Sequence, residues 1–282
     1  MAITVRTNSA AGNALTELNK TSRALSRSFE RISSGLRISR ASDDAAGLGV
    51  AENLRASSAS AIVAGRNIND GMSIIAIAEG ASNEVANILV RMRELAVQSA
   101  SETLGGEERS YIQSEFTSLS QEVDRISNVT EFNGIPLTNG TTASINVQVG
   151  INNTTNDTIS VSLGDYTTTT LGVGVDSTLA TGISLSTAAK AGTSLAAIDS
   201  ALATLNDARA TLGASENRLN SALNNIETYT ETTTAAESRI RDADFGYETA
   251  QLSQNQILQQ AGTSILGQAK NINQAALSLL QG

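Results

Sequence analysis

The sequence predicts a mainly α protein with long antiparallel coiled-coil helices, formed by the N- and C-terminal segments, and a small β-hairpin region in mid-chain. Three observations carry this prediction. Apolar residues near both ends are spaced alternately by three and four positions, which is the period of one seam on a coiled-coil helix. Only one proline, Pro136, occurs in 282 residues, so little interrupts the helical segments. The segment 132–189 lacks Lys, Arg and Glu and contains short runs that alternate apolar with polar residues.

The two terminal series define the expected seams. The N-terminal series comprises Leu15, Leu18, Ser22, Leu25, Phe29, Ile32 and Leu36. The C-terminal series comprises Leu258, Gly262, Ile265, Ala269, Ile272, Ala276 and Leu279. Such stripes are most often intramolecular core, and one interpretation is that the two ends pack only on each other. Because chain ends usually fray, seams that run almost to both termini favour a second interpretation, in which they also pack on other copies of the chain.

Four further helical segments lie between these ends. Segments 85–99 and 112–126 each carry one apolar seam, and a Leu-Gly-Gly-Glu turn at 104–107 predicts that they form a helical hairpin. Segment 198–226 carries the longest seam. Segment 44–80 is rich in Ala and Ser, and we expect its glycines to interrupt the helix while letting neighbouring helices approach closely. These glycines are Gly47, Gly49, Gly65 and Gly71.

The polar middle of the chain predicts strands. Segments 145–149 and 159–163 alternate apolar and polar residues, as half-buried strands do, and 171–175 alternates with glycines between. We expect one or two β-hairpins joined by polar loops. They form an insertion between two helical halves and should lie at the far end of the long helices.

Composition excludes most chemistry. The chain has no Cys and no His, which removes thiol nucleophiles, disulfides, His-based catalytic pairs and nearly every zinc or transition-metal site. We therefore expect no cofactor. The net charge of −9 argues against nucleic acid as a partner. No apolar run is long enough to insert into a membrane, and the N-terminus lacks the pattern of a cleavable secretory signal.

Charge is distributed unevenly between the two ends. Residues 1–41 hold seven cations against two acids, whereas residues 242–282 hold one cation against three acids. The ends are therefore complementary in charge, which is consistent with their pairing, although exposed ion pairs contribute little free energy.

Two acidic patterns resemble sites but have simpler explanations. The pairs Asp43 with Asp44 and Asp242 with Asp244 could suggest a metal or paired catalytic carboxylates; without His, helix caps and solvated ends are the better interpretation. The run 152–157 lacks the residue order of a calcium loop, so we interpret it as a polar loop.

Ordered motifs at both ends resemble one family. Near the N-terminus these are SFERISSGLRISRASDDAAGL at 28–48, RNINDGMS at 66–73 and RMRELAVQS at 91–99. Near the C-terminus they are LGASENRL at 212–219, SRIRDADF at 238–245 and QILQQAG at 256–262, followed by Leu279 and Leu280. Together they cover roughly the first 165 and the last 90 residues. On these motifs the sequence resembles bacterial flagellin, the subunit of the flagellar filament, in its minimal type without large outer domains.

The resemblance implies a structural, non-enzymatic subunit that polymerises into the helical filament of the bacterial flagellum for swimming motility. It implies an inner-tube coiled-coil domain of 1–43 with 240–282. It also implies a helical rod domain of 44–239 that includes a short β-rich variable segment at about 138–188. The implied assembly interface comprises Leu15, Leu18, Leu25, Phe29, Ile32, Leu36, Leu258, Ile265, Ala269, Ile272 and Leu279. The alternative within the same class of proteins is a flagellar hook–filament junction protein.

The resemblance also implies partners and a location. The chain is expected to be secreted through the flagellar export apparatus and to lie in the extracellular filament. Its partners are expected to be other copies of itself, an export chaperone on the C-terminal helix, and the filament cap and hook–filament junction proteins. A host flagellin-sensing Toll-like receptor is a further possible partner, because Arg91, Leu95 and Glu115 match the residue types of the family's receptor epitope.

Overall fold

The computed structural model describes residues 8–175 and 183–281, with side chains described to residue 271. The chain divides into two compact units. Unit 1 comprises Met1–Ser58 with Glu231–Gly282, and unit 2 comprises Ala59–Thr230. Both boundaries fall inside long helices, away from the connectors near 43/44 and 239/240 where the sequence suggested a division. That earlier division stays a prediction.

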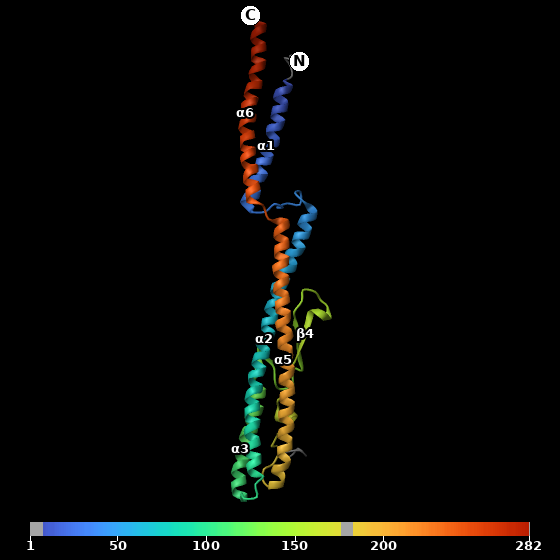
Figure 1. Ribbon diagram of the computed structural model, residues 1–282, viewed down its shortest axis with the longest axis vertical. Coiled ribbons are helices and arrows are strands. Elements are labelled where there is room, and N and C mark those ends of the chain that lie inside the picture. Colours follow the sequence, from blue (N-terminus) through green and yellow to red (C-terminus); the bar gives the residue numbers. More distant parts are fainter. Residues whose placement is uncertain (1–7, 176–182, 282) are drawn as a thin grey trace. The chain divides into compact units, whose positions relative to one another are not determined.

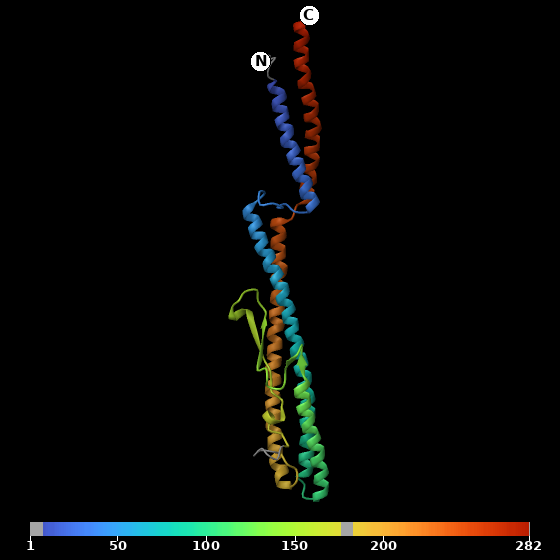
Figure 2. The ribbon, with the colours of Figure 1, turned by 180° about the vertical axis from the view of Figure 1, so that it is seen from behind.

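Unit 1 is built on the pairing of the two terminal helices, α1 (Ser9–Ser34) and α6 (Phe245–Gln281). They lie side by side in both views (Figure 1 and Figure 2). The Asn8 carboxamide oxygen caps α1 by accepting a hydrogen bond from the Ala11 amide at 2.9 Å. α1 ends at Gly35, whose φ of 72° is the left-handed conformation that glycine adopts without steric cost.

The connectors that follow α1 and precede α6 also pair within unit 1. The Arg37 amide donates to the Arg241 carbonyl at 2.7 Å, and the Ala243 amide donates to the Gly35 carbonyl at 2.9 Å. The next helix on each side is capped by an aspartate. Asp44 accepts from the Gly47 amide at 2.8 Å, and Asp244 accepts from the Tyr247 amide at 3.1 Å. The prediction that these aspartates cap helices is confirmed.

Unit 2 packs three helices around an apolar core. They are α2 (Ala45–Ser99), α3 (Gly106–Val129) and α5 (Ala188–Arg241). Within this unit, α2 and α5 lie side by side, and α3 packs alongside them (Figure 1). The predicted hairpin of α2 and α3 around residues 104–107 is confirmed. The core includes Leu89, Met92 and Phe116, all with no exposed surface, together with Ile198 and Leu205 from α5.

The expectation that glycines interrupt the helix at 44–80 is wrong, because α2 runs unbroken for 55 residues. A helix in tertiary contact tolerates isolated glycines when packing outweighs their propensity of about 1 kcal/mol each. The second expectation, that the glycines let neighbouring elements approach α2 closely, is confirmed at Gly65 and Gly71. A Cβ placed on Gly65 would lie 3.5 Å from Ile226 Cγ2 on α5, and one on Gly71 would lie 2.9 Å from Val147 Cγ2.

Two β-hairpins follow α3. The first pairs β1 (Glu131–Phe132) with β2 (Ile135–Pro136). The second pairs β3 (Ser144–Gln148) with β4 (Thr158–Ser162), joined through the short 3-10 helix η1 (Thr155–Asp157). The predicted strands at 145–149 and 159–163 are therefore confirmed within one residue. Their apolar face does not lie at the end of the helices as expected, because Val147 and Val161 belong to a core cluster with Ile75 of α2 and Leu219 of α5.

The strand expected at 171–175 is wrong. Residues Thr168–Leu171 form one helical turn, α4, and Gly172 follows it with φ 69°. Leu171 and Val173 are nonetheless buried in the core of unit 2, because the αL glycine turns the chain so that alternate residues face inward. Within the described residues, none of the helices combines the length and apolar character needed to cross a membrane.

Candidate assembly interface

The contact between α1 and α6 combines small and polar side chains with larger aliphatic ones. Buried and half-buried positions spaced by three and four form what we call the contact series. On α1 the contact series comprises Ala11, Ala14, Leu18, Thr21, Leu25, Ser28 and Ile32. On α6 it comprises Glu248, Leu252, Asn255, Gln259, Gly262, Leu266 and Ala269. The helices approach closely, since a Cβ placed on Gly262 would lie 3.3 Å from Leu18 Cδ1.

Three contacts give the same antiparallel register along the pair. Arg31 meets Glu248 near the connectors, Leu18 meets Gly262 in the middle, and the Asn8 carboxamide donates to the Ala269 carbonyl at 2.8 Å near the other end. In an antiparallel pair one residue number rises as the other falls, so a constant register gives a nearly constant sum. Here the two numbers of each pair sum to between 277 and 280. This confirms that the two ends of the chain pair as helices.

Only part of the implied assembly interface faces this contact. Leu18, Leu25, Ile32 and Ala269 lie in the contact series, and Leu36 is half-buried in the connector opposite Asp242. The remaining described members are exposed: Leu15 by 49%, Phe29 by 66%, Leu258 by 48% and Ile265 by 56%. Ile272 and Leu279 lie outside the residues whose side chains are described. The contact is rotated toward Ala14 and Ser28.

Two of these exposed residues, Leu258 and Ile265, border a groove on unit 1. It has a volume of about 510 Å³ and lies between α1 and α6. One wall carries Ala10, Ala14 and Leu18, and the other carries Leu258 and Ile265. Phe245 and Tyr247 at the start of α6 are also exposed, by 55% and 61%. Unit 1 therefore presents several large apolar side chains to its surroundings.

One ion pair across the contact joins a buried carboxylate to a guanidinium that is 31% exposed. Arg31 Nη1 lies 2.9 Å from Glu248 Oε1, and the Glu248 side chain is 5% exposed. Within residues 8–175 and 183–271, Glu248 is the only acidic residue that is buried. Nearby pairs are more exposed, such as Arg40 with Glu30 on the connector. Sequence reasoning missed this pair, although Glu248 is the only acid in the whole of α6.

The three residues of the implied receptor epitope lie together in unit 2 but differ in exposure. Arg91 Nη2 lies 2.8 Å from Glu115 Oε1, and Arg91 Nη1 lies 2.9 Å from Glu94 Oε2. The hydrogen bonds to Glu94 and Glu115 raise the pKa of the Arg91 guanidinium above its usual value. Leu95 is 1% exposed and belongs to the core. Glu94, which was not predicted from the sequence, also forms an ion pair with Arg91, because the two residues lie three positions apart on one helix.

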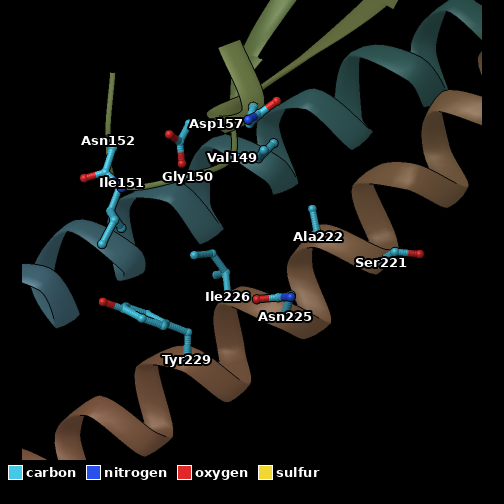
Figure 3. A pocket seen from close by; sticks show the side chains of 11 residues that line it. Val149, Gly150, Ile151, Asn152, Asp157, Ser221, Ala222, Asn225, Ile226 and Tyr229 are labelled. Atoms are coloured by element: carbon cyan, nitrogen blue, oxygen red, sulfur yellow. The ribbon is translucent and has the colours of Figure 1, made fainter. Parts of the chain in front are cut away.

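A second hollow of about 570 Å³ lies in unit 2, between the β3–η1 loop and α5 (Figure 3). Ile226 and Tyr229 project from α5 toward the loop at Ile151. The Gln148 amide holds this loop by donating to the carbonyls of Gly150 at 3.0 Å and Asn152 at 2.7 Å. Residues 152–154 thus form a polar loop, as predicted, whereas Thr155–Asp157 form the 3-10 helix η1. Across the described residues, no group of three or more acidic, His or Cys side chains could hold a metal ion.

Comparison with known proteins identifies the family. The model for the bacterial flagellin N-terminal helical region matches residues 5–143, and the model for the C-terminal helical region matches residues 195–280. This chain belongs to the bacterial flagellin family. The two matches include α1 and α6 and leave between them the polar mid-chain segment.

Relatives in this family span almost the whole chain. A flagellin of Halalkalibacterium halodurans is 39% identical over 90% of this chain and 91% of its own length. The flagellar filament 33 kDa core protein of Treponema phagedenis is 37% identical over 94% of this chain and 95% of its own. The chain is accordingly a structural subunit of a bacterial flagellar filament, and its length of 282 residues fits a minimal member of the family. The flagellin family is one of structural proteins.

A solved structure shares the fold more distantly. A flagellar hook-associated protein from Vibrio parahaemolyticus superposes with a TM-score of 0.58, covers 71% of this chain and all of its own, and is 17% identical. Identity at that level shows the fold alone. Nothing in the comparisons favours a hook–filament junction role over that of a filament subunit.

Proposed function

We propose that copies of this chain polymerise through the exposed apolar residues of unit 1, which we call the assembly face: Leu15, Phe29, Leu258 and Ile265. Exposed apolar side chains gathered on one folded unit mark an interaction surface. Covering each of them with a neighbouring copy contributes on the order of 1–2 kcal/mol, at about 25 cal/mol per Å² of buried apolar area. The observation that carries the proposal is that α1 and α6 pair while leaving these four side chains in water.

The groove between α1 and α6 is the seat for a helix from a second copy. Its walls combine large side chains, Leu258 and Ile265, with the small Ala14, Ala261 and Gly262. A helix can approach small residues closely and still contact the large ones beside them. Because this groove and the side chains that would fill it belong to different places on the same unit, repeating the contact need not close a ring and can generate an open filament.

We assign the inner-tube role to residues 1–43 with 240–282 and the rod role to residues 44–239, including the short variable segment at about 138–188. The filament lies outside the cell, and the chain reaches it through the flagellar export apparatus. An export chaperone on the C-terminal helix, the filament cap and the hook–filament junction proteins are the further partners. Ile272 and Leu279 continue the apolar spacing of Leu258 and Ile265 in the sequence.

The free chain also presents Arg91 and Glu115 to a host flagellin-sensing Toll-like receptor. Both side chains are about half exposed on unit 2, which supports direct contact. Leu95 supports the site from beneath, since its side chain is buried in the core.

The proposal is tested by removing either end. Chains lacking residues 1–40 or residues 245–282 are compared with the full chain by sedimentation and electron microscopy at high salt. The full chain is expected to form long filaments and the truncated chains none, while the urea transition of unit 2 persists in all three. Normal filaments from either truncated chain would refute the proposal. Failure of the full chain to form filaments under seeding would instead favour a junction protein.

A further inference from the structure

The contact between α1 and α6 leaves large apolar side chains on both helices in water, although Leu18, Leu25 and Ile32 lie within it. On α1, Ser28 is 6% exposed whereas the next residue, Phe29, is 66% exposed. Within the described parts of the two helices, residues 9–34 and 245–271, the buried residues are Ser28, Glu248, Asn255 and Ala269. Turning α1 so that Leu15 and Phe29 face α6 would remove more hydrocarbon from water. Some interaction must therefore oppose that alternative.

Helix geometry shows how the Arg31–Glu248 pair opposes it. Residues three apart share one side of a helix, so Arg31 lies on the Ser28 side of the contact line. Phe29 lies on the other side, because one residue turns the helix by about 100°. Rotating α1 to bring Phe29 toward α6 therefore carries the Arg31 guanidinium away from Glu248.

Losing Arg31 would leave Glu248 without its cation in a place where water does not reach. The Glu248 side chain is 5% exposed, and the 2.9 Å contact with Arg31 is the only ion pair recorded for it among the described residues. A buried carboxylate without a partner is strongly unfavourable, although an intact buried pair adds little net stability. Such a pair selects one arrangement rather than stabilising it, as single polar residues do in coiled-coil seams.

We propose that Arg31 and Glu248 are positioning residues for assembly, which fix the rotation of α1 against α6 so that the apolar residues face neighbouring copies. This inference rests on the proposed function, because it assigns the exposed residues to the polymer contact. In the absence of the pair, α1 and α6 close on their own apolar residues. The free chain then becomes more tightly paired and less able to polymerise.

The test replaces the charges with apolar side chains of similar length in the full chain, Arg31→Met together with Glu248→Leu. Circular dichroism is expected to show helix content equal to or greater than that of the unmodified chain. Seeded sedimentation is expected to show a critical concentration raised tenfold or more. If the pair had a purely structural role, its replacement would lower both helix content and polymerisation. Helix content that is kept or raised while polymerisation falls therefore identifies a positioning role. The charge swap Arg31→Glu with Glu248→Arg is expected to restore polymerisation to within about threefold.

A matched control replaces the exposed pair of α3 in the same way, Arg125→Met with Glu122→Leu, and should leave the critical concentration unchanged. The proposal is overturned if the Arg31→Met, Glu248→Leu chain polymerises normally, if it loses helix content, or if the charge swap fails to polymerise at normal helix content. A substitution in the assembly face, Phe29→Ser, distinguishes failure of the proposed function from failure of the positioning role.

If the Phe29→Ser chain polymerises normally, the proposed function is wrong. If the Phe29→Ser chain does not polymerise normally but the Arg31→Met, Glu248→Leu chain does, only the positioning role is wrong.

Discussion

Val147 packs into the notch that Gly71 leaves on α2. A Cβ placed on Gly71 would lie 2.9 Å from Val147 Cγ2 and 3.3 Å from Leu219 Cδ1, so one methyl group would disturb the contact of the β3–β4 hairpin with both long helices. The hairpin belongs to the core of unit 2, where Val161 is 1% exposed, and it ties α2 to α5.

Gly71→Ala is therefore expected to destabilise unit 2 by about 1–3 kcal/mol, the usual cost of overpacking a filled core. Gly80→Ala is the matched control in the same helix, since nothing lies within 4 Å of its added Cβ. That substitution should stabilise by about 0.5–1 kcal/mol through helix propensity and the unfolded chain. Urea denaturation of the full chain measures both, and equal effects of the two substitutions would contradict the packing seen at Gly71.

Asp165 gives unit 2 a dependence on acid. Partial burial opposes ionisation of this carboxylate, but hydrogen bonds from Thr170 and Thr167 prevail and hold its pKa below the usual 3.8. A carboxylate with a lowered folded pKa contributes stability above its unfolded pKa, and this contribution disappears as the pH falls through the folded value. Asp165→Asn should lower the thermal midpoint at pH 7, and the difference from the unmodified chain should shrink steadily below pH 4. A difference independent of pH would contradict the ionised hydrogen bonds.

The residues of the predicted receptor epitope have two different roles: Arg91 and Glu115 would contact the receptor, whereas Leu95 stabilises unit 2 from the core. Arg91→Ala and Glu115→Ala should reduce activation of a flagellin-sensing Toll-like receptor by the free chain without a large change in stability, because exposed ion pairs contribute about 0–1 kcal/mol. Leu95→Ala should destabilise unit 2 by about 2–5 kcal/mol, since it removes a fully buried side chain. A reporter-cell assay paired with thermal denaturation distinguishes the two. Loss of stability with Arg91→Ala equal to that with Leu95→Ala would contradict this division.

The assembly face can be tested by single substitutions. Phe29→Ser or Ile265→Ser should raise the critical concentration for polymerisation by about tenfold, since each removes on the order of 1–2 kcal/mol of apolar burial. Val129→Ser is the control, because Val129 is 58% exposed on α3 of unit 2. Sedimentation after seeded growth measures all three. The same increase from Val129→Ser would show that the effect is not specific to unit 1.

Much of this fold follows from local sequence. The helical period at both ends predicted α1 and α6, and alternation predicted β3 and β4 within one residue. Alternation failed at 171–175, where one turn of helix and a left-handed Gly172 also bring every second residue inward. The prediction that glycines interrupt α2 was wrong because it considered local propensity alone. Their weak propensity is offset by packing against Val147, Leu219 and Ile226, which lie far away in the sequence.

The candidate site was only half predictable. Spacing by three and four identified the helical stripe, and Leu18, Leu25 and Ile32 do lie at the contact. It could not fix the rotation about the helix axis, because a seam of period 3.5 can turn either flank toward its partner. That choice depends on Ser28, Arg31 and Glu248, whose relationship joins residues more than 200 positions apart.

The most direct test is a reconstruction of the filament by electron cryo-microscopy at a resolution that shows side chains. The expected result is α1 and α6 paired through Leu18, Ser28 and Glu248 within one copy, while Phe29 and Ile265 contact neighbouring copies. A filament in which Phe29 and Ile265 are buried within their own copy, or face open solvent, would contradict assembly through this surface.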